Sequence, residues 1–197
     1  MKLFTSDTSP YGRKVRILIA EKNLGDRITL IDQSPFAADV TALREANPLG
    51  KIPALVSEHG ATLYDSRVIC EYLDGLTPSP RLIPDSGPAR IDVLRRQALA
   101  DGVMDAAFNL RMERVRPEAL RSAEWMMRWE GNILRGIAAM EADVREAFDL
   151  GSIAGAAAIG YVEFRLGDLD WRGDAPEVEL WWGRVRVRPS VKSTAPA

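Results

Sequence analysis

A run rich in proline and glycine divides this chain into two differently patterned parts. The residues that interrupt any periodic element between residues 76 and 88 are Pro78, Pro80, Pro84, Gly87 and Pro88. Proline removes a backbone donor and breaks both helices and strands. We therefore interpret residues 78–88 as a linker that joins a domain at residues 1–77 to a domain at residues 89–197.

Residues 1–77 alternate between strand and helix patterns. Short apolar runs bounded by turn residues indicate strands, and apolar residues at helical spacing indicate helices. The expected strands lie at residues 3–4, 28–31, 53–56 and 61–64. The expected helices lie at residues 10–24, 41–46 and 65–73. This alternation predicts a small α/β domain.

The pattern beyond the linker is helical. Apolar residues recur at helical spacing along most of this part. We expect helices at residues 89–116, 117–148, 152–166 and 176–187. The predicted fold is therefore an α/β domain followed by an all-α domain.

The composition is that of a soluble globular protein. Of the 197 residues, 46% are hydrophobic and 27% are charged, with a net charge of −2. This balance is ordinary, and it gives no reason to expect nucleic acid as the main partner. The apolar segment 153–159 is too short to span a bilayer, and the N-terminus lacks the apolar run of a signal peptide. We expect neither a membrane nor a nucleic-acid partner.

The chain has one cysteine and one histidine. A single cysteine excludes an internal disulfide framework, which suits a reducing cytoplasm. So few thiol and imidazole ligands also argue against zinc, and we expect no metal. The chemistry must then come from hydroxyls, carboxylates, backbone amides or a bound small molecule.

The segment between the first strand and the first helix reads Thr8-Ser9-Pro10-Tyr11-Gly12. It resembles the Cys-Pro-Tyr-Cys redox turn of glutaredoxin-like proteins, with Ser9 and Gly12 in place of the two cysteines. A serine cannot exchange disulfides, but its hydroxyl can donate a hydrogen bond to the sulfur of a bound thiol. Taken alone, Ser9 is better interpreted as a helix N-cap, because Pro10 suits the first helical turn.

The energies involved decide whether Ser9 is able to ionise a thiol. A free thiol has a pKa of about 8.5, so ionising most of it at neutral pH requires about 2.7 kcal/mol. A hydrogen bond to a charged group contributes about 1.5–3 kcal/mol, and a helix N-terminus adds roughly 0.3–1 kcal/mol. Ser9 and the helix that begins at Pro10 are therefore sufficient together.

Two further segments carry candidate binding residues. If Pro53 is cis, the turn at Lys51-Ile52-Pro53 exposes the Ile52 amide and carbonyl, which can pair with an extended peptide; otherwise this is an ordinary loop with a solvated lysine. At the next strand-to-helix junction, Ser66 is able to bind a carboxylate and Asp65 a ligand ammonium. Helix capping by either residue explains that junction equally well.

The order of these segments resembles the glutathione S-transferase family. The matching residues are Thr8 to Arg16, Asn47 to Pro53, Tyr64 to Ser66, Ile69, Glu71 to Leu73, Ala100 to Ala106 and Gly160 to Arg165. Each motif is weak alone, but the ordered set is specific and covers essentially the whole chain. The resemblance implies a thioredoxin-like domain followed by a helical domain, usually as a homodimer.

The resemblance also implies a glutathione site, with glutathione as a co-substrate. Ser9 matches the family's catalytic, sulfur-activating serine, and Lys51 matches a residue near the glycine carboxylate of glutathione. Ile52 would pair its backbone with the cysteinyl part, with Pro53 cis. Asp65-Ser66 matches the pair that holds the γ-glutamyl end.

A small electrophile would bind between the two domains. The expected contacts are Tyr11, Met104, Phe108 and Met112; plain core packing explains the three α-domain residues equally well. The leading hypothesis is a glutathione transferase of detoxification type that directs the glutathione thiolate at an electrophile. The alternative is a non-catalytic binding or regulatory protein with the same fold.

One departure from the family concerns the central helix of the second domain. The family often begins that helix with a Ser or Thr cap and an aspartate three residues later. Here we expect Ser152 to be the cap, and Gly155 stands at the aspartate position. This predicts the loss of half of a capping box and a weaker helix.

Overall fold

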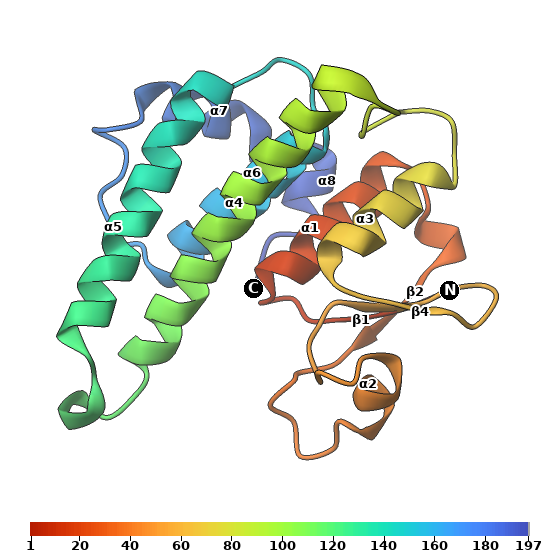
Figure 1. Cartoon of the computed structure of the whole chain (residues 1–197), viewed down its shortest axis with the longest axis horizontal. Helices are drawn as coiled ribbons and strands as arrows, with labels where there is room; N and C mark the ends of the chain where they lie inside the picture. Colours follow the sequence, from red (N-terminus) through yellow and green to blue (C-terminus); the bar gives the residue numbers. More distant parts are fainter. Residues whose placement is uncertain (197) are drawn as a thin grey trace. The chain divides into compact units, whose positions relative to one another are not determined.

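The computed structural model describes residues 1–196, which divide into two compact units (Figure 1). Met1–Ile83 and the described residues from Pro189 onward form the first unit, and Pro84–Arg188 form the second. The division between Ile83 and Pro84 lies inside the segment that we interpret as a linker.

The first unit is a four-stranded sheet with helices on its faces (Figure 1). The strands are β1 (Lys2–Thr5), β2 (Thr29–Asp32), β3 (Ala54–Val56) and β4 (Thr62–Leu63). The helical segments are α1 (Pro10–Glu21), η1 (Gly25–Arg27), α2 (Thr41–Ala46), α3 (Ser66–Gly75) and α8 (Pro189–Lys192). The strand order is β2-β1-β3-β4, with β1 parallel to β2 and antiparallel to β3. This is the thioredoxin-like α/β domain that the sequence predicts.

Side chains alternate across the sheet and fill two hydrophobic layers. Phe4 packs with Leu43 of α2 and with Ala54 of β3 on one face. Leu3 and Leu55, which are paired in the register of β1 and β3, are fully buried and point to the opposite face, because successive strand residues point in opposite directions. The sheet is therefore covered by helices on both faces.

Helix α1 is shorter than the sequence pattern suggests. It ends at Glu21 rather than at Leu24, because Asn23 has a φ of 53° and this left-handed conformation terminates a helix. Its N-terminus agrees with the prediction, with Ser9 as the cap and Pro10 in the first turn.

The second unit is entirely helical. Its segments are α4 (Gly87–Arg114), η2 (Glu118–Leu120), α5 (Ala123–Ala139), η3 (Met140–Asp143), α6 (Leu150–Arg165) and α7 (Pro176–Val185). Helix α4 packs along both α5 and α6, and α6 is buried along most of its length. The expected helix at residues 117–148 is wrong in extent, because Ser122 caps a new helix by accepting from the Trp125 amide at 3.3 Å.

The start of α6 corrects the expectation about its cap. Asp149, not Ser152, is the N-cap, and its carboxylate accepts from the Ser152 amide at 3.1 Å. The serine that we expected as the cap is instead the third residue of the helix. Gly155 lies deep in the helix, where a Cβ atom would meet the Trp181 ring at 3.3 Å. This glycine therefore allows α7 to pack closely, and the helix keeps a cap.

The C-terminal segment also corrects the sequence analysis, which assigned residues up to 197 to the helical domain. Helix α8 packs against α1 in the first unit. The Arg13 guanidinium donates to the Val191 carbonyl at 3.1 Å, and the Arg16 guanidinium donates to the Thr194 carbonyl at 3.4 Å. These partners lie far apart in the sequence, so no local pattern announces the contact.

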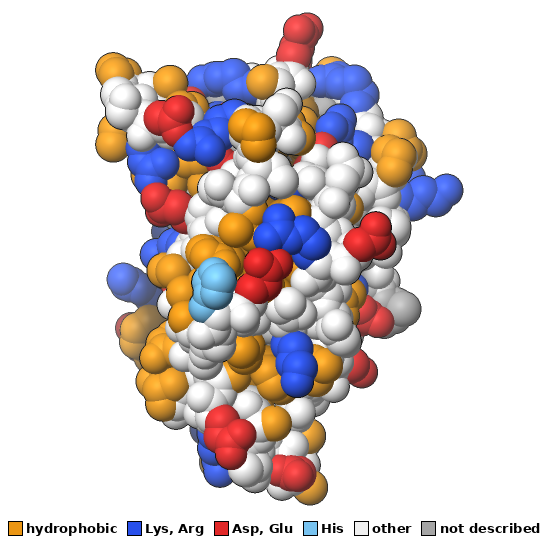
Figure 2. All heavy atoms as spheres, turned by 90° about the vertical axis from the view of Figure 1, so that its right-hand side faces the viewer, with side chains coloured by type: hydrophobic (Ala, Val, Ile, Leu, Met, Phe, Trp, Pro, Cys, Tyr) orange, Lys and Arg blue, Asp and Glu red, His pale blue; other side chains and the backbone are white. Residues whose placement is uncertain are grey.

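The single histidine lies in a surface turn and the single cysteine lies in the core. His59 is exposed in the turn between β3 and β4 (Figure 2), and Cys70 is fully buried in α3. Among residues 1–196, no three His, Cys, Asp or Glu side chains gather as metal ligands would. No helix in the described part of the chain is both long and apolar enough to cross a membrane.

A buried ion pair holds the end of the first unit together. The Lys22 ammonium donates to the Asp74 carboxylate at 2.9 Å and to the carbonyls of Thr77 and Pro80 at 2.8 and 2.7 Å. The Asp74 carboxylate accepts from the backbone amides of residues 82–83 at 3.0 and 3.1 Å. Both side chains are almost inaccessible, at 0% and 2%. The proline-rich segment is thereby fixed to α1 and α3.

We predict that Lys22→Met lowers the free energy of unfolding by about 3–5 kcal/mol, because it removes the buried cationic partner of the Asp74 carboxylate and leaves only the more distant Arg81, at 3.9 Å. Urea denaturation measures this loss. The matched control is Arg27→Met, which breaks the exposed Arg27–Glu58 pair and should have a much smaller effect. Equal losses in the two variants would contradict the prediction.

Candidate functional site

Strand pairing brings the three candidate segments to one edge of the sheet. Phe4 pairs with Ala54, so the end of β1 lies beside the start of β3. Leu55 pairs with Leu63 in the antiparallel pair β3–β4, so the end of β4 lies beside the start of β3 as well. The segments that carry Ser9, Ile52 and Asp65 therefore leave the sheet at the same edge, although they are far apart in the sequence.

Ser9 is half-buried at the N-terminus of α1. Its Oγ accepts from the Gly12 amide at 3.1 Å, so the prediction of a cap is confirmed. This bond uses a lone pair, whereas the hydroxyl proton stays available for a second partner. The cap interpretation and the sulfur-donor interpretation are therefore compatible in one side chain.

Asn47 organises the loop before β3, and the sequence analysis gave it no role. Its side chain, only 2% exposed, donates to the Lys51 carbonyl at 2.8 Å and accepts from the Leu49 amide at 3.1 Å. Gly50 takes the left-handed conformation, with a φ of 61°. An asparagine before proline and glycine is a turn signal, and it was available in the sequence.

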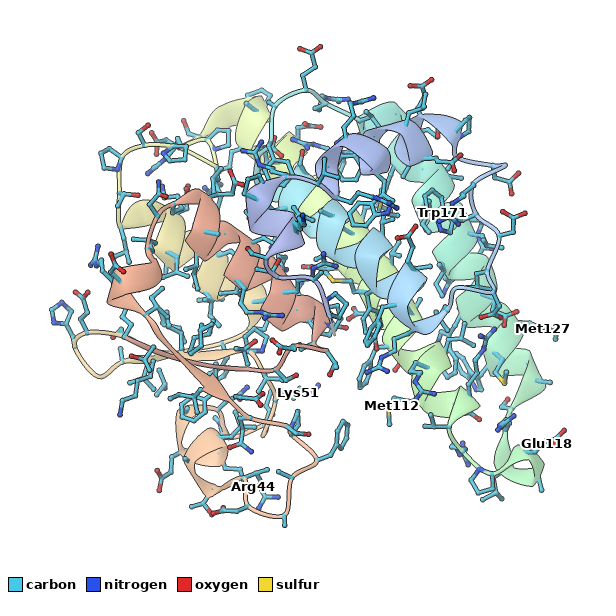
Figure 3. The ribbon with its side chains drawn as sticks, turned by 180° about the vertical axis from the view of Figure 1, so that it is seen from behind. Arg44, Lys51, Met112, Glu118, Met127 and Trp171 are labelled. Carbon is cyan, nitrogen blue, oxygen red and sulfur yellow. The ribbon has the colours of Figure 1, made fainter. Side chains whose placement is uncertain are left out.

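The residues that follow this turn are those implied by the family resemblance. The Ile52–Pro53 peptide bond is cis. Ile52 is half-buried and Pro53 is buried. Lys51 is exposed beside them, and Figure 3 shows it on the loop that enters β3.

Asp65 and Ser66 form the N-terminus of α3. The Asp65 carboxylate caps the helix by accepting from the Arg67 amide at 2.9 Å, and it pairs with the Arg67 guanidinium at 3.0 Å. Ser66 is the first helical residue and is 3% exposed. Burial raises the pKa of Asp65, but the Arg67 hydrogen bonds and the charges of Arg67 and Lys14 outweigh it, so the pKa lies below its usual value.

Two helix N-termini therefore open at this edge of the sheet. Helix α1 follows Ser9 and α3 follows Asp65. Neither helix has an acidic residue in its first turn. The partial positive charge at the N-terminus of α1 is therefore not offset by a carboxylate, whereas the Asp65 carboxylate offsets that of α3. The N-terminus of α1 therefore favours an anion such as a thiolate, and the Asp65 carboxylate at the start of α3 favours a cationic group.

The residues expected to contact an electrophile differ in accessibility. Tyr11 is half-buried in the first turn of α1. On α4, Met104 is fully buried and Phe108 is half-buried, whereas Met112 is 37% exposed (Figure 3). Core packing, the alternative that the sequence left open, fits the burial of Met104.

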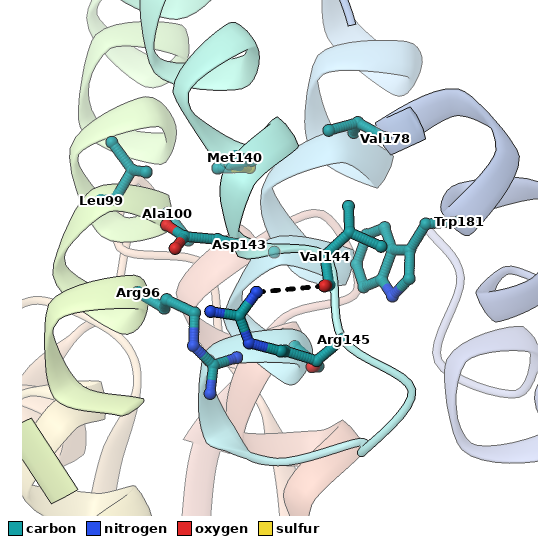
Figure 4. A pocket seen from close by; sticks show the side chains of 12 residues that line it. Arg96, Leu99, Ala100, Met140, Asp143, Val144, Arg145, Val178 and Trp181 are labelled. Carbon is teal, nitrogen blue, oxygen red and sulfur yellow. Dashed lines mark hydrogen bonds between the residues drawn. The ribbon is translucent and has the colours of Figure 1, made fainter. Parts of the chain in front are cut away.

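A small pocket in the second unit is lined by residues that differ from the predicted site residues (Figure 4). It is lined by Arg96, Leu99, Ala100, Met140, Asp143, Val144, Arg145, Gly151, Ser152, Gly155, Val178 and Trp181. The Arg145 guanidinium lies across it and donates to the Val144 carbonyl at 3.2 Å. None of the predicted site residues lines this pocket, so the candidate site rests on the sheet edge.

Comparison with known proteins agrees with this geometry. Residues 8–76 match the family model described as "Glutathione S-transferase, N-terminal domain". The chain is 34% identical to the "Uncharacterized GST-like protein YibF" of Escherichia coli K12, over 100% of this chain and 98% of that protein. The chain belongs to the glutathione S-transferase family. Its thioredoxin-like domain and its helical remainder are the two parts of the fold of that family.

Solved structures of the glutathione S-transferase family include two with informative ligands. A glutathione transferase family member from Pseudomonas fluorescens Pf-5, with bound glutathione, is 41% identical, with a TM-score of 0.94 over 100% of this chain and 98% of that chain. A family member from the same strain contains bound S-(propanoic acid)-glutathione; it is 38% identical, with a TM-score of 0.91 over 100% of both chains.

A second group of relatives has a different name. The "Stringent starvation protein A homolog" of Pasteurella multocida Pm70 is 34% identical over 134 residues, which cover 62% of this chain and 61% of that protein. This family member shares a part of the chain only, so its similarity carries less weight than a match along the whole length.

We predict that Asp65 stabilises the protein above about pH 4 and loses this effect in acid. The pKa of its carboxyl is lowered in the folded state, so the stabilisation disappears as the pH falls below the ordinary carboxyl range and through the folded pKa. Asp65→Asn keeps an acceptor for the Arg67 amide but has no charge.

Urea denaturation of both proteins at several pH values tests this prediction. The difference in stability between the wild type and Asp65→Asn should shrink as the pH is lowered from about 6 to about 3. Glu45→Gln, a substitution of an exposed carboxylate on α2 in the same unit, is the control for a general loss of surface charge. A difference that does not depend on pH would refute the prediction.

Proposed function

We propose that this chain is a glutathione transferase that ionises the thiol of glutathione and directs the thiolate at a small electrophile. The observation that carries the proposal is the common sheet edge where Ser9, with an available hydroxyl proton, accompanies the N-termini of α1 and α3. The glutathione bound to the Pseudomonas fluorescens family member supports the choice of thiol.

In this proposal the first unit contacts all three residues of glutathione. Lys51 attracts the glycine carboxylate, and the backbone of Ile52, next to the cis peptide bond of Pro53, pairs with the cysteinyl part. Asp65 accepts from the γ-glutamyl ammonium, and Ser66 binds the carboxylate at the same end. The low pKa of Asp65 keeps its carboxylate charged for this purpose.

The chemical step follows from the energies available at sulfur. The thiol proton leaves to solvent, and the remaining thiolate accepts the Ser9 hydroxyl proton as a hydrogen bond of about 1.5–3 kcal/mol. The N-terminus of α1 adds up to about 1 kcal/mol. The sulfur then forms a bond to the electrophilic carbon. The electron pair that this carbon shared with its leaving group, or in its activated double bond, moves away onto that group.

The electrophile is proposed to contact Tyr11, Met104, Phe108 and Met112. S-(propanoic acid)-glutathione in the related structure is a thioether of glutathione, which is the kind of product that attack on carbon yields. We propose carbon electrophiles of similar size for this chain. We further propose that it acts as a cytoplasmic homodimer in detoxification, as the family resemblance implies.

Replacement of Ser9 tests the mechanism. Ser9→Ala should raise the thiol pKa of bound glutathione by about one to two units, because the charge-assisted hydrogen bond is lost. Conjugation with a model electrophile should slow by about tenfold or more at neutral pH. Thiolate absorbance against pH and steady-state kinetics measure the two effects.

Two control variants separate the donor from the cap. Ser122→Ala removes the equivalent cap of α5 in the second unit and should lower stability by about 1 kcal/mol without changing the thiol pKa. Ser9→Asp keeps a cap acceptor but places a negative charge beside sulfur, so it should be stable and inactive. Unchanged turnover in both Ser9 variants would exclude the mechanism.

The second candidate function is that of a non-catalytic regulatory protein. The observation that favours it is the similarity to the "Stringent starvation protein A homolog". This alternative predicts weak or absent glutathione binding and a specific protein partner. Two measurements distinguish the functions. The first is retention on immobilised glutathione with elution by free glutathione, and the second is an activity assay of the eluted protein with a panel of electrophiles.

A further inference from the structure

A second hydroxyl lies against the cap of α1 and has no assigned role. Thr5 is the last residue of β1 and is 4% exposed. Its backbone is fixed, because the Thr5 carbonyl accepts from the Gln33 amide at 2.8 Å. Thr5 lies on the face of β1 opposite to Phe4, since strand side chains alternate.

Gly12 determines how closely Thr5 approaches the cap. A Cβ atom at position 12 would lie 2.3 Å from Thr5 Oγ1 and 3.3 Å from Ser9 Oγ. The first separation is shorter than any ordinary contact, so the Thr5 hydroxyl occupies the space that a side chain at position 12 would need. Both hydroxyls therefore border the space where a side chain at position 12 would lie.

The Thr5 hydroxyl is buried, and among the described residues its Oγ1 has no hydrogen-bond partner. A buried hydroxyl without a partner destabilises a fold, whereas an apolar group of the same shape does not. Valine has that shape. The hydroxyl thus lowers stability where it is, which calls for a functional explanation.

The hydrogen-bonding capacity of Ser9 supplies one. A serine hydroxyl accepts two hydrogen bonds and donates one. Ser9 Oγ accepts one from the Gly12 amide, and in the proposed function it donates its proton to the glutathione thiolate. One acceptor position remains, and Thr5 carries the neighbouring donor that is not in use.

We propose that Thr5 is a positioning residue of the sulfur site, which turns its hydroxyl toward Ser9 Oγ when a thiolate is bound. This inference rests on the proposed function and adds a residue to it. The second accepted bond keeps the Ser9 hydroxyl pointing its proton at the thiolate. It also polarises the Ser9 hydroxyl, because hydrogen bonds in a chain strengthen one another. Thr5 itself does not touch the substrate.

Thr5→Val tests the proposal, because it removes the hydroxyl and keeps the shape. The thiol pKa of bound glutathione should rise, so that the thiolate fraction below neutral pH falls by about two- to tenfold, the effect of one hydrogen bond. Affinity for S-methylglutathione, which has no thiol to ionise, should stay within about twofold. The melting temperature should be unchanged or higher.

Two further variants make the result specific to this hydroxyl. Thr5→Ser keeps the donor and should restore the thiolate fraction. Thr77→Val is the matched control, since Thr77 Oγ1 is likewise buried without a partner among the described residues but lies in the segment after α3. It should leave the thiol pKa unchanged.

The outcomes also separate this inference from the proposed function. If the wild type binds neither glutathione nor S-methylglutathione, the proposed function is refuted and this inference with it. If the wild type ionises glutathione and Thr5→Val does so equally well, only the role of Thr5 is refuted. If Thr5→Val weakens S-methylglutathione binding by as large a factor as it lowers the thiolate fraction, Thr5 has a packing role. That outcome also refutes the positioning role of Thr5.

Discussion

The pairing of β1 on both of its sides is the constraint on which the candidate site depends. β1 lies between β2, to which it is parallel, and β3, to which it is antiparallel. Its end therefore meets the start of β3, and the register of β3 with β4 brings in the start of α3. A slip of one residue would turn Leu3 out of the core, so burial enforces the register that assembles the site.

Capping connects this architecture to chemistry. A helix that starts at a sheet edge needs acceptors for its first amides, and Ser9 and Asp65 supply them. The same two residues are proposed to hold the thiol and the ammonium of glutathione. Structural and functional demands coincide here, because the N-terminus of α1 attracts an anion such as a thiolate and the carboxylate that caps α3 can also accept from an ammonium.

Long-range contacts explain the expectations that failed. Asp149 caps α6 and also pairs with Arg96 of α4, so the tertiary partner helps to fix the helix cap three residues before the expected one. The C-terminal segment joins the first unit through Arg13 and Arg16, both on α1. Periodicity within a segment cannot report either contact, because each joins residues far apart in the chain.

Local patterns in the sequence predicted the two-part organisation, most of the helices and strands, and the candidate residues at positions 9, 51–53 and 65–66, because periodicity and turn chemistry are local properties. The three-dimensional fold was needed to show that these positions share one edge and that Asn47 fixes the loop before β3. It also showed that the hydroxyls of Thr5 and Ser9 both border the space left by Gly12. Strand register and close packing create these contacts, and both depend on the whole domain.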